Sequence, residues 1–131
     1  MNLEALVNAA RDVRANAHAP YSKFQVGAAV LSASGHVYVG CNVENATYGA
    51  TICAERAAVC AMVAAGETRA QAIAVYTDCN PLATPCGICR QVLSEFAEDM
   101  PVILAGPGQQ SELSLAALLP NRFILSPKGA E

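Results

Sequence analysis

The residues of this chain most able to do chemistry are three cysteines and one glutamate. Cys53-Ala54-Glu55-Arg56 places a thiol, a carboxylate and a guanidinium within four residues, and Cys86-Gly87-Ile88-Cys89 begins 33 residues after Cys53. A Cys-x-x-Cys pair supplies two of the four ligands that zinc prefers, and Cys53 is a candidate third. No second such pair completes a closed site, and His18 and His36 lie far from both motifs in the sequence. Three protein ligands with an open fourth position are typical of catalytic zinc.

The charges around such a site also point to catalysis. Both cysteine motifs are predicted to begin helices, whose N-termini lower thiol pKa values. Zinc with three thiolates has a net charge of −1, so a nearby cation is expected, and Arg56 and Arg90 are both candidates. Glu55 is a candidate proton shuttle, because a carboxylate beside an activated water can take its proton and pass it to a leaving group. This machinery is suited to the hydrolytic loss of ammonia.

The elements that must position these residues follow from hydrophobic periodicity and turn signals. Helices are predicted over 3–17, 53–65, 86–96 and 113–119, strands over 24–31, 36–41, 72–77 and 101–105, polar loops over 42–49 and 78–84, and an irregular tail from 121. This order predicts an α/β sandwich with a mixed sheet. Gly27 and Gly40 indicate bulges or close backbone approach. The segment 57–65 is apolar on every side, so we expect a sheet to cover one side and another subunit the other.

Composition limits the class of protein. The 131 residues fit one domain, residues 1–131, and 53% are hydrophobic while only 15% are charged. The net charge is −3 and no basic cluster is present, which argues against nucleic-acid binding. No apolar run is long enough to span a membrane, and the start of the chain does not read as a signal peptide, so we expect a cytoplasmic protein. Its six cysteines are then expected to be reduced.

Beyond these arguments, the chain resembles a known family. Cys53-Ala54-Glu55 followed by Pro85-Cys86-x-x-Cys89 looks like the zinc-dependent deaminases. With Phe24-Gln25-Val26-Gly27 and Asn42-Val43-Glu44-Asn45, the motifs together resemble the short, homotetrameric cytidine deaminases, over about residues 20–123. The resemblance implies a three-layer α/β/α sandwich with a mixed five-stranded sheet, one zinc ion per chain, and hydrolysis of cytidine and 2'-deoxycytidine to uridine and 2'-deoxyuridine in pyrimidine salvage.

Residue roles are implied by the resemblance as well. It implies that Cys53, Cys86 and Cys89 bind zinc, and that Glu55 protonates ring nitrogen N3 and then assists the departure of ammonia. It also implies that Asn42 and Glu44 bind the ribose hydroxyls, that Phe24 packs on the nucleoside, and that the backbone at Ala54 contacts the base. Tyr48 and Phe123 match positions that reach the site of a neighbouring subunit in a tetramer. Arg56 would support the thiolates. The tail after Phe123 departs from the family pattern, reading Ile124-Leu125-Ser126-Pro127-Lys128-Gly129.

Other interpretations remain open at this point. The altered tail also suits a deaminase of another aminated heterocycle, such as blasticidin S. A different class is a non-catalytic zinc-stabilised or redox protein that uses Cys86 and Cys89. The same residues could also be purely structural. Glu55 could stabilise the helix dipole, Asn42 and Glu44 could stabilise a turn, and Phe24 and Phe123 could pack in the core.

Overall fold

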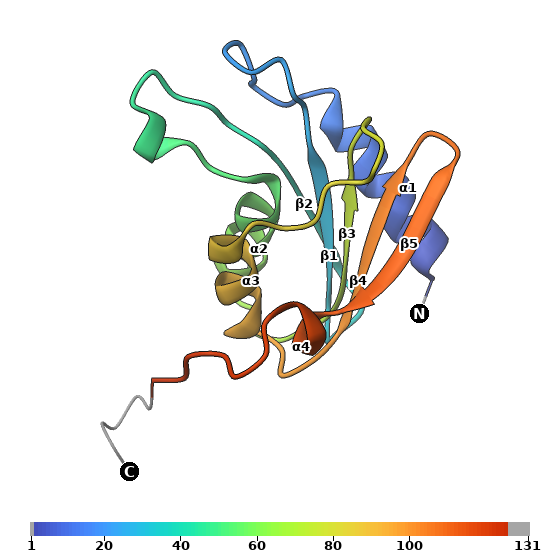
Figure 1. Cartoon of the computed structure of the whole chain (residues 1–131). Helices are drawn as coiled ribbons and strands as arrows, with labels where there is room; N and C mark the ends of the chain where they lie inside the picture. The colour runs from blue at the N-terminus through green and yellow to red at the C-terminus, as the bar shows by residue number, and fades with distance from the viewer. Residues whose placement is uncertain (1, 126–131) are drawn as a thin grey trace.

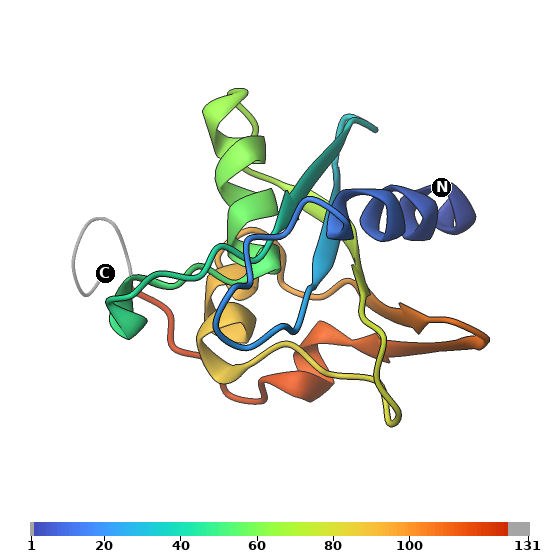
Figure 2. The ribbon, with the colours of Figure 1, turned by 90° about the horizontal axis from the view of Figure 1, so that it is seen from above.

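The fold is a five-stranded sheet with helices on both faces (Figure 1). The computed structural model describes residues 2–125. Its elements are, in chain order, α1 (Leu3–Arg14), β1 (Gly27–Ser32), β2 (Val37–Cys41), the 3-10 turn η1 (Tyr48–Ala50), α2 (Ala54–Ala64), β3 (Ala70–Tyr76), α3 (Gly87–Ser94), β4 (Pro101–Gly106), β5 (Gln109–Ser114) and α4 (Leu115–Leu118). Seen from above, α1 and α2 lie on opposite sides of the sheet (Figure 2). The predicted three-layer sandwich is confirmed.

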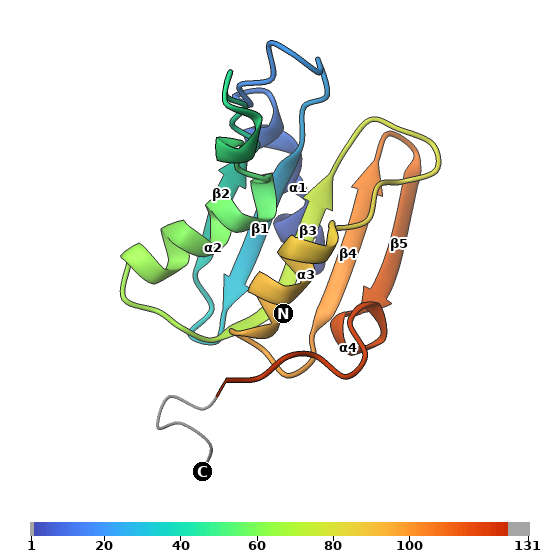
Figure 3. The same cartoon turned by 60° about the vertical axis from the view of Figure 1, so that its left-hand side comes forward.

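The sheet separates two hydrophobic cores. Its strand order is β2-β1-β3-β4-β5, and it is mixed because β3 and β4 run parallel while the other neighbours are antiparallel. Successive residues of a strand point to opposite faces. In β1, Ala28 and Val30 therefore pack in the core beneath α2 and α3, whereas Ala29 and Leu31 pack beneath α1. Figure 3 shows α2, α3 and α4 together on the face opposite α1.

Two glycines let helix backbones lie directly against strands. A Cβ on Gly27 would overlap the Ala10 carbonyl oxygen of α1, and a Cβ on Gly40 would overlap the Ala58 nitrogen of α2. Every other residue carries a Cβ, so only glycine permits these contacts. The predicted close backbone approach is confirmed at both positions, and it sets how near the two helical layers lie to the sheet.

Helix α2 is buried on one side only. Ala54, Ala58 and Met62 are buried against the sheet, whereas Cys60 and Val63 face outward, with Val63 42% exposed. The sheet covers one side of 57–65 as predicted, and covering of the outward side by another subunit stays a prediction. Among residues 2–125, no helix has the length and apolarity needed to cross a membrane.

The strand expected over 24–31 begins later, at Gly27, for a physical reason. The Phe24 carbonyl and the Val26 N–H both bond to the Asn42 side chain at 2.8 Å, so they are not available to a neighbouring strand. Helix α1 also ends early, at Arg14, because the amides of Asn16 and Ala17 bond three residues back and tighten the last turn.

Strand β5 is missing from the predicted elements, and the helix expected over 113–119 is shorter. The sequence Gln109-Gln110-Ser111-Glu112 is exposed at the sheet edge and lacks the alternation that marks a half-buried strand. Ser114 then caps α4, its hydroxyl accepting the Ala117 N–H at 3.3 Å. In the tail, Ile124 and Leu125 are exposed, and the divergent residues 126–129 lie outside the described part of the chain.

Substituting Gly40 tests how closely α2 approaches the sheet. We expect Gly40→Ala to lower the free energy of unfolding by about 1–3 kcal/mol, because its Cβ would also lie 2.7 Å from the Ala54 carbonyl oxygen. Urea denaturation measures the change. Gly49→Ala is the matched control, because a Cβ at Gly49 meets nothing within 4 Å. Equal stability of the two variants would contradict the close contact.

Candidate metal centre and active site

Two helix N-termini bring three thiols together. Cys53 is the N-cap of α2 and Cys86 is the N-cap of α3, while Cys89 lies in the first turn of α3. Their sulfur atoms lie within 4.8 Å of one another, and the Cys86 Sγ is 3.4 Å from the Cys89 Sγ. Cys89 is buried, Cys53 is half-buried and Cys86 is exposed, so the cluster opens to one side.

The three thiols fit a zinc ion. Zn–S distances of about 2.3 Å in a tetrahedron put neighbouring sulfurs about 3.8 Å apart, which agrees with the observed spacing. Within residues 2–125 no other group of three such side chains is close enough to hold a metal, and neither histidine joins this one. Zinc held by these three thiols would keep its fourth coordination position for a small molecule.

Hydrogen bonds prepare the cluster for ionisation. The Cys89 thiol and the Arg56 guanidinium both donate to Cys53 and lower its pKa to about 5, against the opposing effect of burial. The hydrogen bond that the Cys89 thiol donates to Cys53 raises the pKa of Cys89, and burial adds to this effect. The Arg56 Nη2 lies 3.4 Å from the Cys53 Sγ. This environment favours the thiolate of Cys53, the form that binds metal, while Cys89 is the hydrogen-bond donor to it.

The choice between the two arginines is decided by geometry. Arg90 donates to the Pro85 carbonyl at 2.8 Å and the Leu118 carbonyl at 2.9 Å, so it ties α3 to its surroundings. Arg56 instead contacts the Cys53 sulfur and the Thr51 carbonyl. Arg56 is thus the cation beside the thiols.

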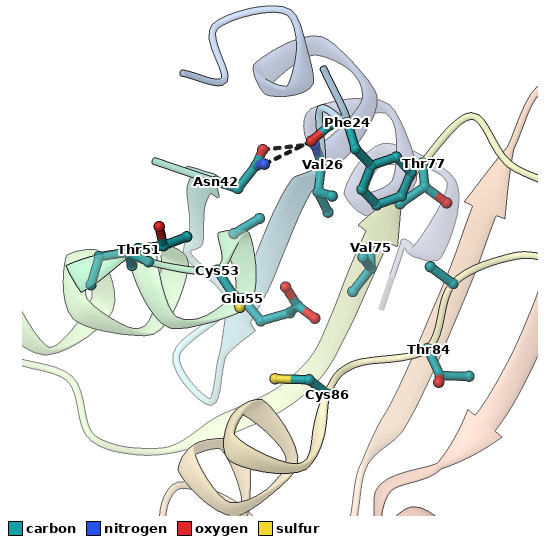
Figure 4. A pocket seen from close by; sticks show the side chains of 13 residues that line it. Phe24, Val26, Asn42, Thr51, Cys53, Glu55, Val75, Thr77, Thr84 and Cys86 are labelled. Atoms are coloured by element: carbon teal, nitrogen blue, oxygen red, sulfur yellow. Dashed lines mark hydrogen bonds between the residues drawn. The ribbon is translucent and has the colours of Figure 1, made fainter. Parts of the chain in front are cut away.

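Glu55 lies beside the thiols and points into a pocket. It belongs to the first turn of α2 and is only 6% exposed. Figure 4 shows the side chains of Cys53, Glu55 and Cys86 directed toward one another. Burial raises the pKa of Glu55, and the negative charge on Cys53 adds to the effect. A carboxyl group with a raised pKa accepts a proton more readily than an exposed one, which suits a proton-transfer role.

The pocket beside Glu55 has a volume of about 210 Å³. Its lining comes from the loop before β1, the residue after β2, the segment that leads into the first turn of α2, the end of β3 and the loop before α3. The residues are Phe24, Val26, Asn42, Thr51, Ile52, Cys53, Ala54, Glu55, Val75, Thr77, Ala83, Thr84 and Cys86. An apolar pocket with a few convergent polar groups is typical of a small-molecule site.

Comparison with known proteins now identifies the family. A family model described as the cytidine and deoxycytidylate deaminase zinc-binding region matches residues 1–105. The chain belongs to this deaminase family. A cytidine deaminase of Sporosarcina psychrophila is 44% identical over 125 residues, which cover 94% of this chain and 92% of the relative.

Solved structures agree with this membership. The crystal structure of a cytidine deaminase from Burkholderia pseudomallei is 43% identical with a TM-score of 0.89, covering 94% of this chain and 100% of that chain. A cytidine deaminase structure from Mycobacterium tuberculosis is 41% identical with a TM-score of 0.81, covering 95% and 99%. The chain is a hydrolytic deaminase whose cofactor is zinc, and Cys53, Cys86 and Cys89 are placed to hold that ion.

The structure brings some of the predicted site residues of this deaminase together and separates others. Phe24, Asn42 and Ala54 line the same pocket as Glu55. Glu44 and Tyr48 line a neighbouring hollow, shared with Tyr21 and Ser22 among others.

Phe123 lies apart from both hollows. It is 69% exposed, and its carbonyl accepts the Gln91 side-chain amide at 3.1 Å. Neither hollow of its own chain includes it among the lining residues. The substrate contact predicted for Phe123 stays a prediction.

Some pocket residues of this deaminase had no signal in the sequence. The segment 78–84 is predicted as a loop with no functional role, yet Ala83 and Thr84 form one wall of the pocket. Thr77, which directly precedes this loop, also lines the pocket. These small, uncharged residues have no distinctive spacing, so only their position in space reveals them.

Metal content tests the three-thiol centre. We expect about one zinc ion per chain in the unsubstituted protein and almost none in Cys53→Ala, Cys86→Ala or Cys89→Ala, because two thiols bind zinc far more weakly than three. Elemental analysis after dialysis measures this. Cys60→Ala is the matched control, since Cys60 is exposed on the outward side of α2. Full zinc content in any of the three variants would remove that residue from the site.

Proposed function

We propose that this chain deaminates cytidine and 2'-deoxycytidine hydrolytically, giving uridine and 2'-deoxyuridine with release of ammonia. The observation that carries the proposal is the buried Glu55 carboxyl, which shares one pocket with the Cys53 and Cys86 thiols and the Phe24 ring. The relatives described as cytidine deaminases support the same substrate class.

Glu55 is proposed to move the protons of the reaction. When bound by Cys53, Cys86 and Cys89, zinc would supply Lewis acidity that makes a water molecule more acidic. Glu55 takes one proton from the water that attacks C4 and gives it to N3, and it then takes the remaining proton of the oxygen now bonded to C4 and gives it to the departing amino group. One water is consumed and one ammonia leaves, so the carboxyl ends in its initial state. Its raised pKa supports this exchange in both directions.

Groups of this pocket and of the neighbouring hollow are proposed to hold the nucleoside. The Asn42 amide already donates one N–H to Phe24 and accepts one from Val26, which leaves one N–H to donate to a ribose hydroxyl. Glu44 accepts bonds from Tyr21 and Ser22, and its Oε2 keeps an acceptor position for a second hydroxyl. Phe24 would pack on the substrate, and the backbone at Ala54 would contact the base.

A homotetramer is proposed as the active form, with each site completed by its neighbours. Tyr48 is 79% exposed and Phe123 is 69% exposed, so large aromatic surfaces project from the single chain. The outward side of α2, with Val63, adds apolar surface. We further propose one domain over 1–131, a cytoplasmic location in keeping with six free thiols, and a role in pyrimidine salvage.

Removing the carboxylate tests the reaction and the shuttle together. We expect the zinc-loaded protein to convert cytidine to uridine, which is measured by ultraviolet absorbance. Glu55→Gln should reduce kcat by about 10²–10⁴-fold, because the proton transfers are lost. Glu112→Gln on the exposed edge strand is the control and should retain full activity. If the unsubstituted protein binds one zinc per chain but leaves cytidine and deoxycytidine unchanged, these substrates are rejected and other aminated heterocycles, including blasticidin S, come next.

Mixed tetramers test whether Phe123 serves a neighbouring site. We expect co-expressed Glu55→Gln and Phe123→Ala chains to show more activity than the mean of the two separate variants, because one chain's intact Glu55 meets another chain's intact Phe123. Light scattering on the same sample gives the oligomeric mass. An activity equal to the mean, or a monomeric mass, would contradict shared sites.

A further inference from the structure

The turn that presents Phe24 to the pocket is held almost entirely by side chains. It runs from Pro20 to Phe24 and lies outside every helix and strand. Its direction is set by Lys23, whose φ of 62° is in the left-handed region, and whose N–H donates to the Ala19 carbonyl at 3.0 Å. A non-glycine residue persists in that region only when its surroundings fix it.

One carboxylate fixes the first half of this turn. The Glu44 Oε1 accepts the N–H of Tyr21 at 3.0 Å and the N–H of Ser22 at 3.1 Å. Its Oε2 accepts the Ser22 hydroxyl. These bonds lower the pKa of Glu44, with the Ser22 hydroxyl as the largest cause. Glu44 thus keeps its negative charge and holds the turn through Ser22.

The Ser22 hydroxyl connects Glu44 to the backbone of Phe24 through hydrogen bonds. A hydroxyl offers one donor and two acceptor positions. Ser22 donates to Glu44 and accepts the Phe24 N–H at 3.0 Å. Asn42 binds the other side of Phe24, donating to its carbonyl at 2.8 Å. Both peptide groups of Phe24 are therefore fixed, and Figure 4 shows its ring beside the pocket that holds Glu55.

We propose that Ser22 is a positioning residue of the nucleoside site, which joins the Glu44 carboxylate to the Phe24 backbone. The inference rests on the proposed function, because positioning matters only if Phe24 and Glu44 meet the substrate. Ser22 lies outside the pocket next to Glu55, and in the hollow that it shares with Glu44 its hydroxyl is already bonded to Glu44 and to the Phe24 N–H, so its effect passes through these two neighbours. It also determines which acceptor position of the Glu44 Oε2 remains for a ribose hydroxyl.

The test separates binding from chemistry. We expect Ser22→Ala to raise KM for cytidine about tenfold and to leave kcat within about twofold, because a hydrogen bond to a charged group that orders the binding surface is lost. Ser22→Thr keeps the hydroxyl and should restore KM. Ser111→Ala, on the exposed strand β5, is the matched control and should not change KM. An unchanged KM in Ser22→Ala, or no rescue by threonine, would overturn the proposal.

A double-mutant cycle tests whether Ser22 affects KM through Phe24. In a Phe24→Ala background, Ser22→Ala should raise KM clearly less than tenfold, since the ring that Ser22 positions is gone and only its effect through Glu44 remains. A full tenfold effect in that background would show that Ser22 does not act through Phe24 and would overturn the proposal.

Amide hydrogen exchange gives a readout without turnover. The Phe24 amide should exchange faster in Ser22→Ala than in the unsubstituted protein and in Ser22→Thr, because its acceptor is removed. Equal exchange in all three would overturn the proposal. An unsubstituted protein that fails to turn over cytidine would overturn the proposed function instead, and the exchange rates would then decide alone whether Ser22 positions Phe24.

Discussion

The whole site depends on the convergence of two helix N-termini on one face of the sheet. Cys53 caps α2 and Cys86 caps α3, and both helices pack on the core opposite α1. A helix N-terminus has free N–H donors and partial positive charge, which stabilise thiolates and favour a metal ion bound between them. Residues 33 positions apart meet because β2 and β3 both run antiparallel to β1, so these two strands end at the same edge of the sheet, and α2 and α3 begin after them. Glu55 comes two residues after Cys53, in the first turn of α2, and is buried beside the thiols.

The chemical centre was predictable from the sequence because its residue types are few and specific. Three thiols and a carboxylate at that spacing favour a metal site, and the structure places Cys53, Cys86 and Cys89 together. The spacing alone left both Arg56 and Arg90 as candidate cations, because the choice depends on which side chain has carbonyl partners elsewhere. Arg90 has two such partners and Arg56 reaches a sulfur.

The parts that escaped prediction are those with weak local signals. Strand β5 is a polar edge strand that is held by pairing with β4, a non-local interaction. The pocket wall at Ala83 and Thr84 consists of ordinary loop residues that matter only through their position. The late start of β1 has a similar origin, because Asn42 takes the backbone groups that a longer strand would have used. Tertiary contacts decided each of these features.

The network of Asn42, Glu44 and Ser22 has a consequence for ligand recognition. Its hydrogen bonds are present in the protein alone, so the conformational entropy of the turn before β1 is lost during folding rather than when a ligand arrives. A preorganised wall of this kind favours tight binding of a ligand that matches its shape. The same rigidity penalises larger or differently shaped ligands, because the turn cannot move aside without breaking several bonds at once. The rigidity of this turn would then contribute to discrimination between ligands as much as the direct contacts with the ligand do.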